Sequence, residues 1–252
     1  MAETASERRA TGGSSHFWIR RLHSLSGIIP IGVFLAFHLS INATMALARN
    51  GAAFQFAVDG IHLMDRLGIL KLVEIVGIFI PLAFHAVVGV LIWLSGRQNV
   101  LAYRYWANFR YTLQRWTGLI TLAFILFHLW HMHWLGAWWP PGGQNFDADF
   151  APYTAARAIQ ANAWLVPIYA VGVLAAVFHF CNGIWAFLIV WGIAITRPAQ
   201  ARVGYVCTAI GLGLATLGMA SLLRLARADL ADFPVPPDKS ISEALVLAGD
   251  GS

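Results

Sequence analysis

The sequence predicts an all-α membrane protein with five transmembrane helices. Of its 252 residues, 58% are hydrophobic and 12% are charged, whereas a soluble domain averages about 45–50% and about 25%. Eleven tryptophans also fit a membrane protein, because tryptophan anchors helices at the lipid headgroups. In addition, five stretches stay apolar for the roughly 20 residues that a hydrocarbon core of about 30 Å requires.

The five apolar stretches occupy most of the chain and give the predicted helices in order. They run over about Leu22–Leu47, Gly68–Ser95, Leu113–Trp138, Ala163–Ile195 and Val203–Leu223. Three of them contain a proline, which membrane helices tolerate because neighbouring groups satisfy the freed backbone atoms. The fourth stretch is the longest, so we expect it to tilt or to project beyond the bilayer.

Both ends of the chain differ from this apolar middle. Residues 1–15 are polar and lack the apolar core of a signal peptide, so a disordered cytoplasmic tail is expected there. Residues 227–252 are acidic and rich in proline, which predicts a flexible extracytoplasmic tail. Residues 16–226 then form one five-helix domain. The loop between the second and third stretches has four arginines and no acid, which places the N-terminus in the cytoplasm and the C-terminus outside.

Composition also excludes several kinds of site. The net charge is +5, but basic residues of a membrane protein collect in cytoplasmic loops, so no nucleic-acid partner is expected. The two cysteines, Cys181 and Cys207, are too few for an iron–sulfur cluster, which needs about four ligands. No glycine-rich dinucleotide loop follows a predicted strand.

One histidine lies deep inside each of the first four stretches: His38, His85, His128 and His179. Ionisable residues are costly inside a membrane, so four of them indicate a function. Zinc usually takes additional cysteine or carboxylate ligands, and a proton relay would use Asp or Glu at the same depth. Haem fits best, because its apolar ring lies between helices and histidine supplies the axial ligand. Two b-type haems in a bundle of the first four helices would use all four histidines.

The local sequences and depths predict how these histidines pair. LAFHLS in the first stretch resembles ILFHLW in the third, and LAFHAVVG in the second resembles AVFHFCNG in the fourth. Counted at about 1.5 Å per residue, His38 and His128 lie nearer the outer ends than the other two. We therefore expect His38 and His128 to bind an outer haem, and His85 and His179 an inner haem. The glycines that follow a histidine by one turn, and would leave room for a flat ring or for helix packing, are Gly89 and Gly183.

Four segments carry a resemblance to a known family: RRLHSLSGIIPIGVFLAFHL, EIVGIFIPLAFHAVVGV, LQRWTGLITLAFILFHLW and YAVGVLAAVFHFCNGIWAFLIVWGI. They closely resemble the single-polypeptide, di-haem cytochrome b subunit of succinate:quinone oxidoreductases, as found in Gram-positive bacteria and in related fumarate reductases. The resemblance runs from about His16 to the end of the fifth helix. It implies a five-helix anchor in the bacterial cytoplasmic membrane, with the haem ligands paired as above.

The resemblance also implies partners and a quinone. A cytoplasmic subunit with covalent FAD would oxidise succinate, and an iron–sulfur subunit would feed electrons to the inner haem. The quinone, usually menaquinone in this family, would react near the outer haem. A quinone site needs a polar group that exchanges protons and an apolar slot for the ring. The candidates on the outer side are Glu74, Asn42 and His131, although Glu74 could instead pair with Lys71, and His131 shares a face with His128.

Basic residues near the cytoplasmic ends of the helices have two candidate roles. Haem propionates are anionic, and near the inner haem Arg21, His23, Ser24 and Arg115 are placed to meet them, with anchoring to the membrane surface as the alternative. The loop from Arg97 to Arg115, with Tyr103, Tyr105 and Trp106, is expected to dock the iron–sulfur subunit or to contact headgroups.

Two other functions remain open on the residues alone. Paired histidines in a helical bundle would also suit the cytochrome b subunit of another respiratory complex, such as a hydrogenase or a formate dehydrogenase. A haem-free transporter could use membrane histidines as a proton relay. A reduced-minus-oxidised spectrum separates the last possibility from the first two, because a haem-free protein shows no b-type absorbance.

Overall fold

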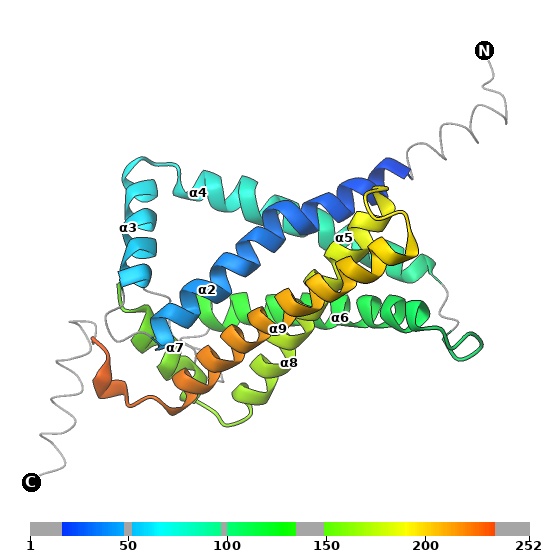
Figure 1. The fold of residues 1–252 in the computed structure, drawn as a ribbon. Coiled ribbons are helices and arrows are strands. Elements are labelled where there is room, and N and C mark those ends of the chain that lie inside the picture. The colour runs from blue at the N-terminus through cyan, green and yellow to red at the C-terminus, as the bar shows by residue number, and fades with distance from the viewer. Residues whose placement is uncertain (1–16, 48–51, 97–99, 135–148, 235–252) are drawn as a thin grey trace, which may run out of the picture.

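The computed structural model describes residues 17–47, 52–96, 100–134 and 149–234, and all regular structure in these ranges is helical (Figure 1). The predicted all-α class is therefore confirmed. The tail expected at 1–15 lies outside the described residues, as does the greater part of the tail expected at 227–252.

The first long helix, which we call helix 1, starts at Phe17 and contains a π-helical segment, η1 (Gly27–Gly32), before it continues as α2 (Val33–Leu47). Pro30 lies inside η1, and because proline has no backbone N–H it cannot complete an α-helical ladder. A π-helical turn takes up an extra residue, so the helix passes the proline without breaking.

An additional helix precedes the second span. This helix, α3 (Ala52–Arg66), has one apolar and one polar face and was not predicted as a separate element. A turn at Gly68, with a φ of +69°, then leads into α4 (Leu70–Leu72). The same helical rod continues as η2 (Val73–Phe79) and α5 (Ile80–Ser95), so it corresponds to the second predicted span.

The second half of the chain contributes four α-helices and a third π-helical segment. In order these are α6 (Trp106–Leu129), η3 (Trp130–Trp134), α7 (Ala151–Gln160), α8 (Leu165–Val190) and α9 (Arg197–Arg227). Gly192, with a φ of +74°, lies in the tight turn between α8 and α9. The hydroxyl of Thr196 accepts a hydrogen bond of 3.3 Å from the backbone nitrogen of Ala199, which caps the start of α9.

The long helices pack around α8, which lies between α6 and α9, while α2 packs along α9 (Figure 1). Leu39, Val177, Cys181 and Leu214 form the buried contact among α2, α8 and α9. Helix α5 packs on η1 and α6. The helices that carry the four histidines therefore surround a common interior.

Four helices are long and apolar enough to cross a membrane: Phe17–Thr44, Leu70–Ser95, Leu165–Val190 and Arg197–Arg227. Helix α6 is comparably long but is not among them. Its mean hydropathy is lowered by Gln114 and Arg115 toward one end and by His128 at the other. The structure therefore supports four of the five predicted spans, and the third, Leu113–Trp138, stays a prediction.

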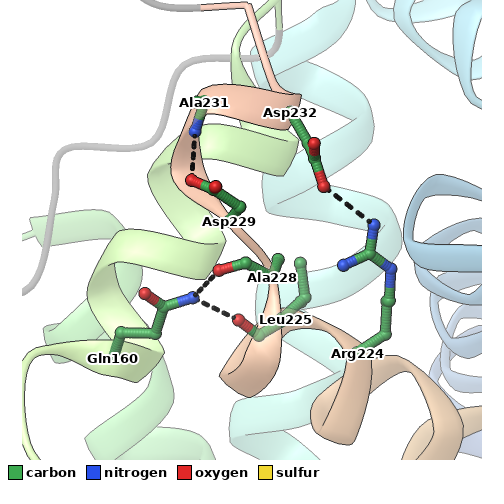
Figure 2. A network of polar contacts seen from close by, with 7 residues as sticks. All are labelled: Gln160, Arg224, Leu225, Ala228, Asp229, Ala231 and Asp232. Carbon is green, nitrogen blue, oxygen red and sulfur yellow. Dashed lines mark hydrogen bonds and ion pairs between the residues drawn. The ribbon is translucent and has the colours of Figure 1, made fainter.

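Gln160, the last residue of α7, fastens the far end of α9 (Figure 2). Its side-chain nitrogen donates to the carbonyls of Leu225, at 2.8 Å, and Ala228, at 2.9 Å. The last carbonyls of a helix have no partner within the helix, so these bonds cap α9. Just beyond, Arg224 and Asp232 form an ion pair of 3.5 Å. The short helix α7 is thereby fixed across the end of the bundle.

Candidate functional site

The four histidines are partly buried and lie in two pairs, each contributed by two different helices. His85 on α5 and His179 on α8 have ring centres 6.1 Å apart, with their planes at 86°. His38 on α2 and His128 on α6 have ring centres 5.9 Å apart, with their planes at 76°. We call these the inner pair and the outer pair. The structure thus brings together the same partners that local sequence and depth had paired.

Both separations suit one metal held between two imidazoles. A metal–imidazole bond is about 2.0–2.1 Å and the ring centre lies about 1.1 Å beyond the nitrogen, so two imidazoles on opposite sides of a metal have centres about 6.2–6.4 Å apart. The observed 5.9 Å and 6.1 Å are close to this value. Imidazoles stacked face to face are closer, as for His23 and His85, whose rings have centres 4.0 Å apart.

Each histidine of the inner pair is oriented by a backbone carbonyl. The Nδ1 atom of His85 lies 2.9 Å from the carbonyl oxygen of His23, and Nδ1 of His179 lies 3.0 Å from that of Gln114. A carbonyl can only accept, so Nδ1 carries the hydrogen in both rings and Nε2 keeps its lone pair. Metal-bound histidines usually donate their second nitrogen in this way, which fixes the ring and raises its basicity.

A glycine faces each ring of the inner pair. A Cβ added to Gly27 would overlap the imidazole of His85, and a Cβ added to Gly118 would lie 2.8 Å from Cε1 of His179. Each glycine lies one turn after the residue whose carbonyl receives the bond, His23 or Gln114. Helix 1 and α6 thus contact the two rings in the same way, through a backbone carbonyl and a glycine one turn after it. Neither glycine was predicted from the sequence.

A repeat between helix 1 and α6 would have identified them. GIIPIGVFLAFH in helix 1 matches GLITLAFILFH in α6, except that the first has one more residue between its glycine and its histidine. The π-helical segment η1 lies within this longer version, and a π turn accommodates an inserted residue. The rings of Phe34 and Phe124 stack on His38 and His128 in the same manner, at 5.4 Å and 5.8 Å.

Gly89 and Gly183, which the sequence singled out, face neighbouring side chains. A Cβ on Gly89 would lie 3.2 Å from Cε1 of His23, and a Cβ on Gly183 would lie 3.5 Å from the side-chain nitrogen of Gln114. Gly89 therefore leaves room for the His23 ring, which in turn stacks on His85. Their suggested role beside a haem stays a prediction.

Arg21 and Ser24 connect the start of helix 1 to the end of α8. The Arg21 guanidinium lies 4.4 Å from the ring centre of Phe17 and 5.0 Å from that of Trp191, and it donates a bond of 3.2 Å to the carbonyl of Val190. The indole nitrogen of Trp191 donates to the Ser24 hydroxyl at 3.2 Å. Arg21 and Ser24, two of the four candidates for propionate binding, thus lie together at one end of the helices that carry the inner pair.

Arg115 is buried and caps the end of α5. Its guanidinium donates to the carbonyls of Ile92, at 3.3 Å, Trp93 and Gly96, at 3.3 Å, and to the Tyr111 hydroxyl at 2.9 Å. A cation is favourable at a helix C-terminus, where carbonyls without partners gather. Its contacts are therefore with α5, and its suggested contact with a propionate stays a prediction.

A polar network that the sequence did not reveal leads from the start of α6 to His179. Arg110 donates from Nε to the side-chain oxygen of Asn182 at 2.7 Å, and Asn182 donates to the Gln114 side-chain oxygen at 2.8 Å. Gln114 in turn donates to the carbonyl of His179 at 3.0 Å. The Arg110 guanidinium also lies 3.9 Å from the Trp185 ring centre. These bonds fix α6 against α8 where the inner pair lies.

The outer pair borders a buried tyrosine and a third histidine. His131 on η3 is 0% exposed, and its Nδ1 lies 2.7 Å from the hydroxyl of Tyr169 on α8. The same hydroxyl lies 3.4 Å from Nδ1 of His128. His128 faces His38, with ring centres 5.9 Å apart, and its assignment as an outer haem ligand stays a prediction. Tyr169 was not a candidate in the sequence analysis.

Glu74 and Asn42 lie apart from this cluster in their contacts. Glu74 is partly exposed in η2, and Asn42 is partly exposed on α2, one turn beyond His38. In the described part of the chain, no hydrogen bond or ion pair joins either side chain to His131. Their membership of a common site with His131 therefore stays a prediction.

Comparison with known proteins identifies the family of this chain. A scan against models of protein families finds no match. The chain is, however, 39% identical over 213 residues to the succinate dehydrogenase cytochrome b558 subunit of Bacillus subtilis (strain 168). The aligned segment covers 83% of this chain and 97% of that relative. With this identity over nearly the whole relative, the chain belongs to the family of succinate dehydrogenase cytochrome b subunits.

Proposed function

We propose that this chain anchors a succinate:quinone oxidoreductase in the bacterial cytoplasmic membrane and conducts its electrons through two b-type haems. The observation that carries the proposal is the two imidazole pairs, with 6.1 Å and 5.9 Å between ring centres. The family relationship supports the anchor role. The b-type cytochrome in the relative's name supports haem as the group that the histidines hold.

The residues around each pair fit a haem. His85 and His179 would present Nε2 to the inner iron, since Nδ1 of each is directed at a carbonyl. His38 and His128 would serve the outer iron. When bound, each haem supplies a one-electron carrier whose potential depends on axial ligands, burial and hydrogen bonding. Gly27 and Gly118 keep the space beside the inner rings free of side chains.

The spacing of the two pairs suits electron transfer across the membrane. Gly118 marks the level of the inner pair on α6, and His128 lies ten residues farther along the same helix. At about 1.5 Å per residue the two levels are about 15 Å apart, roughly half of a hydrocarbon core of about 30 Å. Two carriers at this separation span about half of the slab.

Quinone, for which menaquinone is the proposed type, is assigned to the outer level. Asn42 lies one turn beyond His38 and His131 one turn beyond His128, so both share a helix face with an outer ligand. Glu74 precedes His85 by eleven residues, or about 16 Å, which puts it near the level of the outer pair. Each of the three offers a polar group for proton exchange, within walls that are otherwise apolar.

The opposite end of the bundle is assigned to the cytoplasm and to the partner subunits. The starts of helix 1, α6 and α9 and the end of α8 meet there, and the arginines at that end are Arg20, Arg21, Arg104, Arg110, Arg197 and Arg202. The positive-inside rule makes this the cytoplasmic face. An iron–sulfur subunit bound to this face, with an FAD subunit beyond it, would deliver electrons near the inner pair.

Succinate-dependent reduction of menaquinone tests the proposal. The chain is purified with whatever subunits accompany it, and succinate oxidation, quinone reduction and the reduced-minus-oxidised spectrum are followed together. The proposal expects both activities and a b-type spectrum that succinate itself reduces. A coloured complex that accepts electrons only from formate or hydrogen would assign the chain to a different respiratory complex. A colourless, active transporter would refute haem altogether.

A further inference from the structure

One buried hydroxyl lies between two histidines at the outer level. Tyr169 is 6% exposed and its ring packs edge-on against Phe124, with centres 5.3 Å apart. Its hydroxyl oxygen lies 2.7 Å from Nδ1 of His131 and 3.4 Å from Nδ1 of His128. These two imidazoles come from η3 and α6, and the tyrosine comes from α8. A single oxygen thus connects three helical segments.

Only one arrangement of hydrogens satisfies all of these atoms if His128 gives Nε2 to iron. Its Nδ1 then carries a hydrogen and donates to the Tyr169 oxygen. The tyrosine directs its own hydrogen to Nδ1 of His131, which accepts. His131 is left with its hydrogen on Nε2. The chain of bonds therefore runs in one direction, from the outer ligand through the hydroxyl to His131.

This series of hydrogen bonds ends at Nε2 of His131. Nε2 of His131 is buried, and no hydrogen-bond partner for it lies within the described residues. Buried polar atoms normally find a partner, and the exceptions are often functional. This nitrogen is a donor in the arrangement above, so it suits a ligand that offers an acceptor, such as a quinone carbonyl.

We propose that Tyr169 is a positioning residue that couples the outer haem ligand His128 to the quinone-facing nitrogen of His131. This inference rests on the proposed function, since it assumes an outer haem and a nearby quinone, and it adds the residue that connects them. The inner pair is oriented differently, because the carbonyls of His23 and Gln114 receive its Nδ1 bonds. At the outer level the replaceable side chain of Tyr169 lies at Nδ1 of His128, whereas at the inner level the Ser26 hydroxyl, 3.5 Å from Nδ1 of His85, lies farther away than the carbonyl at 2.9 Å. A mutation at Tyr169 can therefore address the outer haem separately.

Tyr169→Phe in the assembled complex tests the coupling, because it keeps the ring and removes the oxygen. Loss of an acceptor at Nδ1 makes the His128 ligand less basic, which favours the reduced iron. We expect both haems to be retained and the outer midpoint potential to rise. A tenfold change in the ratio of reduced to oxidised outer haem would correspond to about 59 mV for one electron. The inner potential should stay the same.

Tyr153→Phe is the matched control, since Tyr153 is also buried at that end of the bundle and its hydroxyl accepts a bond of 3.2 Å from Arg157. It should leave both potentials as in the wild type. Equal outer potentials in Tyr169→Phe, Tyr153→Phe and the wild type would overturn the coupling. A wild-type complex without an outer haem would instead refute the proposed function, so the two failures are distinct.

A second variant keeps the test decisive if Tyr169→Phe does not accumulate. His131→Phe retains the stacking on Phe127, whose ring centre lies 5.3 Å from that of His131. It removes the acceptor of the tyrosine hydrogen, so the hydroxyl reorients and the outer potential shifts while the inner one does not. An unshifted outer potential in this variant would likewise overturn the coupling.

Discussion

Gly118 on α6 stands directly against the ring of His179 on α8, so close that a Cβ at this position would lie 2.8 Å from Cε1 of the imidazole. Real side chains essentially never approach so closely. The backbone of α6 and the ring of His179 are therefore in contact because residue 118 has no side chain. The same relationship joins Gly27 to His85 across the other half of the bundle.

Gly118→Ala should cost the protein its inner haem. Either the ring of His179 turns or α6 shifts outward, and both changes spoil the bond between His179 Nδ1 and the Gln114 carbonyl. Difference spectra and redox titration of the membranes would report one b-type component, the outer one. Gly213→Ala on α9 is the control, because nothing lies within 4 Å of a Cβ there. Wild-type spectra from both variants would contradict the conclusion that Gly118 leaves the space that the His179 ring needs.

Alanine substitutions of the four histidines test the pairing. His85→Ala and His179→Ala should remove the same haem, and His38→Ala and His128→Ala should remove the other, since each pair encloses one centre. Redox titration of each variant identifies the component that is lost. Removal of one component by both His38→Ala and His85→Ala would refute the pairing.

Deletion of Ile29 tests the role of the π-helical segment. The deletion makes the spacing from Gly27 to His38 equal to that from Gly118 to His128. Because the extra residue is accommodated in η1, removing it should shorten the π-helical segment around Pro30 and keep both haems. Deletion of Leu35 within α2 is the comparison, since it turns His38 off its face and should remove the outer haem. Identical spectra from the two deletions would count against the account of η1.

Gln160→Ala should lower stability without changing the spectra. The substitution removes two hydrogen bonds that cap α9, at 2.8 Å and 2.9 Å, and leaves two carbonyls without partners, at a cost of about 1–3 kcal/mol. Thermal unfolding in detergent should occur at a lower temperature, with haem absorbance intact before the transition. Gln55→Ala removes an exposed bond to Asp59 of 3.1 Å and should change little. A similar shift in both variants would contradict the capping role.

The sequence predicted the helical class and the histidine pairs because both follow from properties of single helices. Length and apolarity mark a span, and the depth of a histidine can be counted along one helix. Helix α6 departs from the pattern, since the histidine and the two arginines that it needs for its contacts also make it less apolar. The residues that carry its function thus weaken the very signal by which a span is recognised.

Features that depend on contacts between helices were beyond the sequence. Gly27 and Gly118 matter because of the rings that face them, and glycine is common in membrane helices for other reasons. Tyr169 has no local signature, since it gains its role only where α8 meets η3. Arg115 looked free to meet an anion, but its carbonyl partners belong to α5. In each case the decisive neighbour lies far away in the sequence.

The haem content of the purified complex tests the central claim most directly. Pyridine haemochrome analysis against the protein concentration, combined with redox titration, gives the number of b haems per chain and the number of distinct potentials. Two haems per chain with two potentials are predicted, because two separate imidazole pairs are present. An active complex with no haem, or with one haem that survives substitution of all four histidines, would contradict the account.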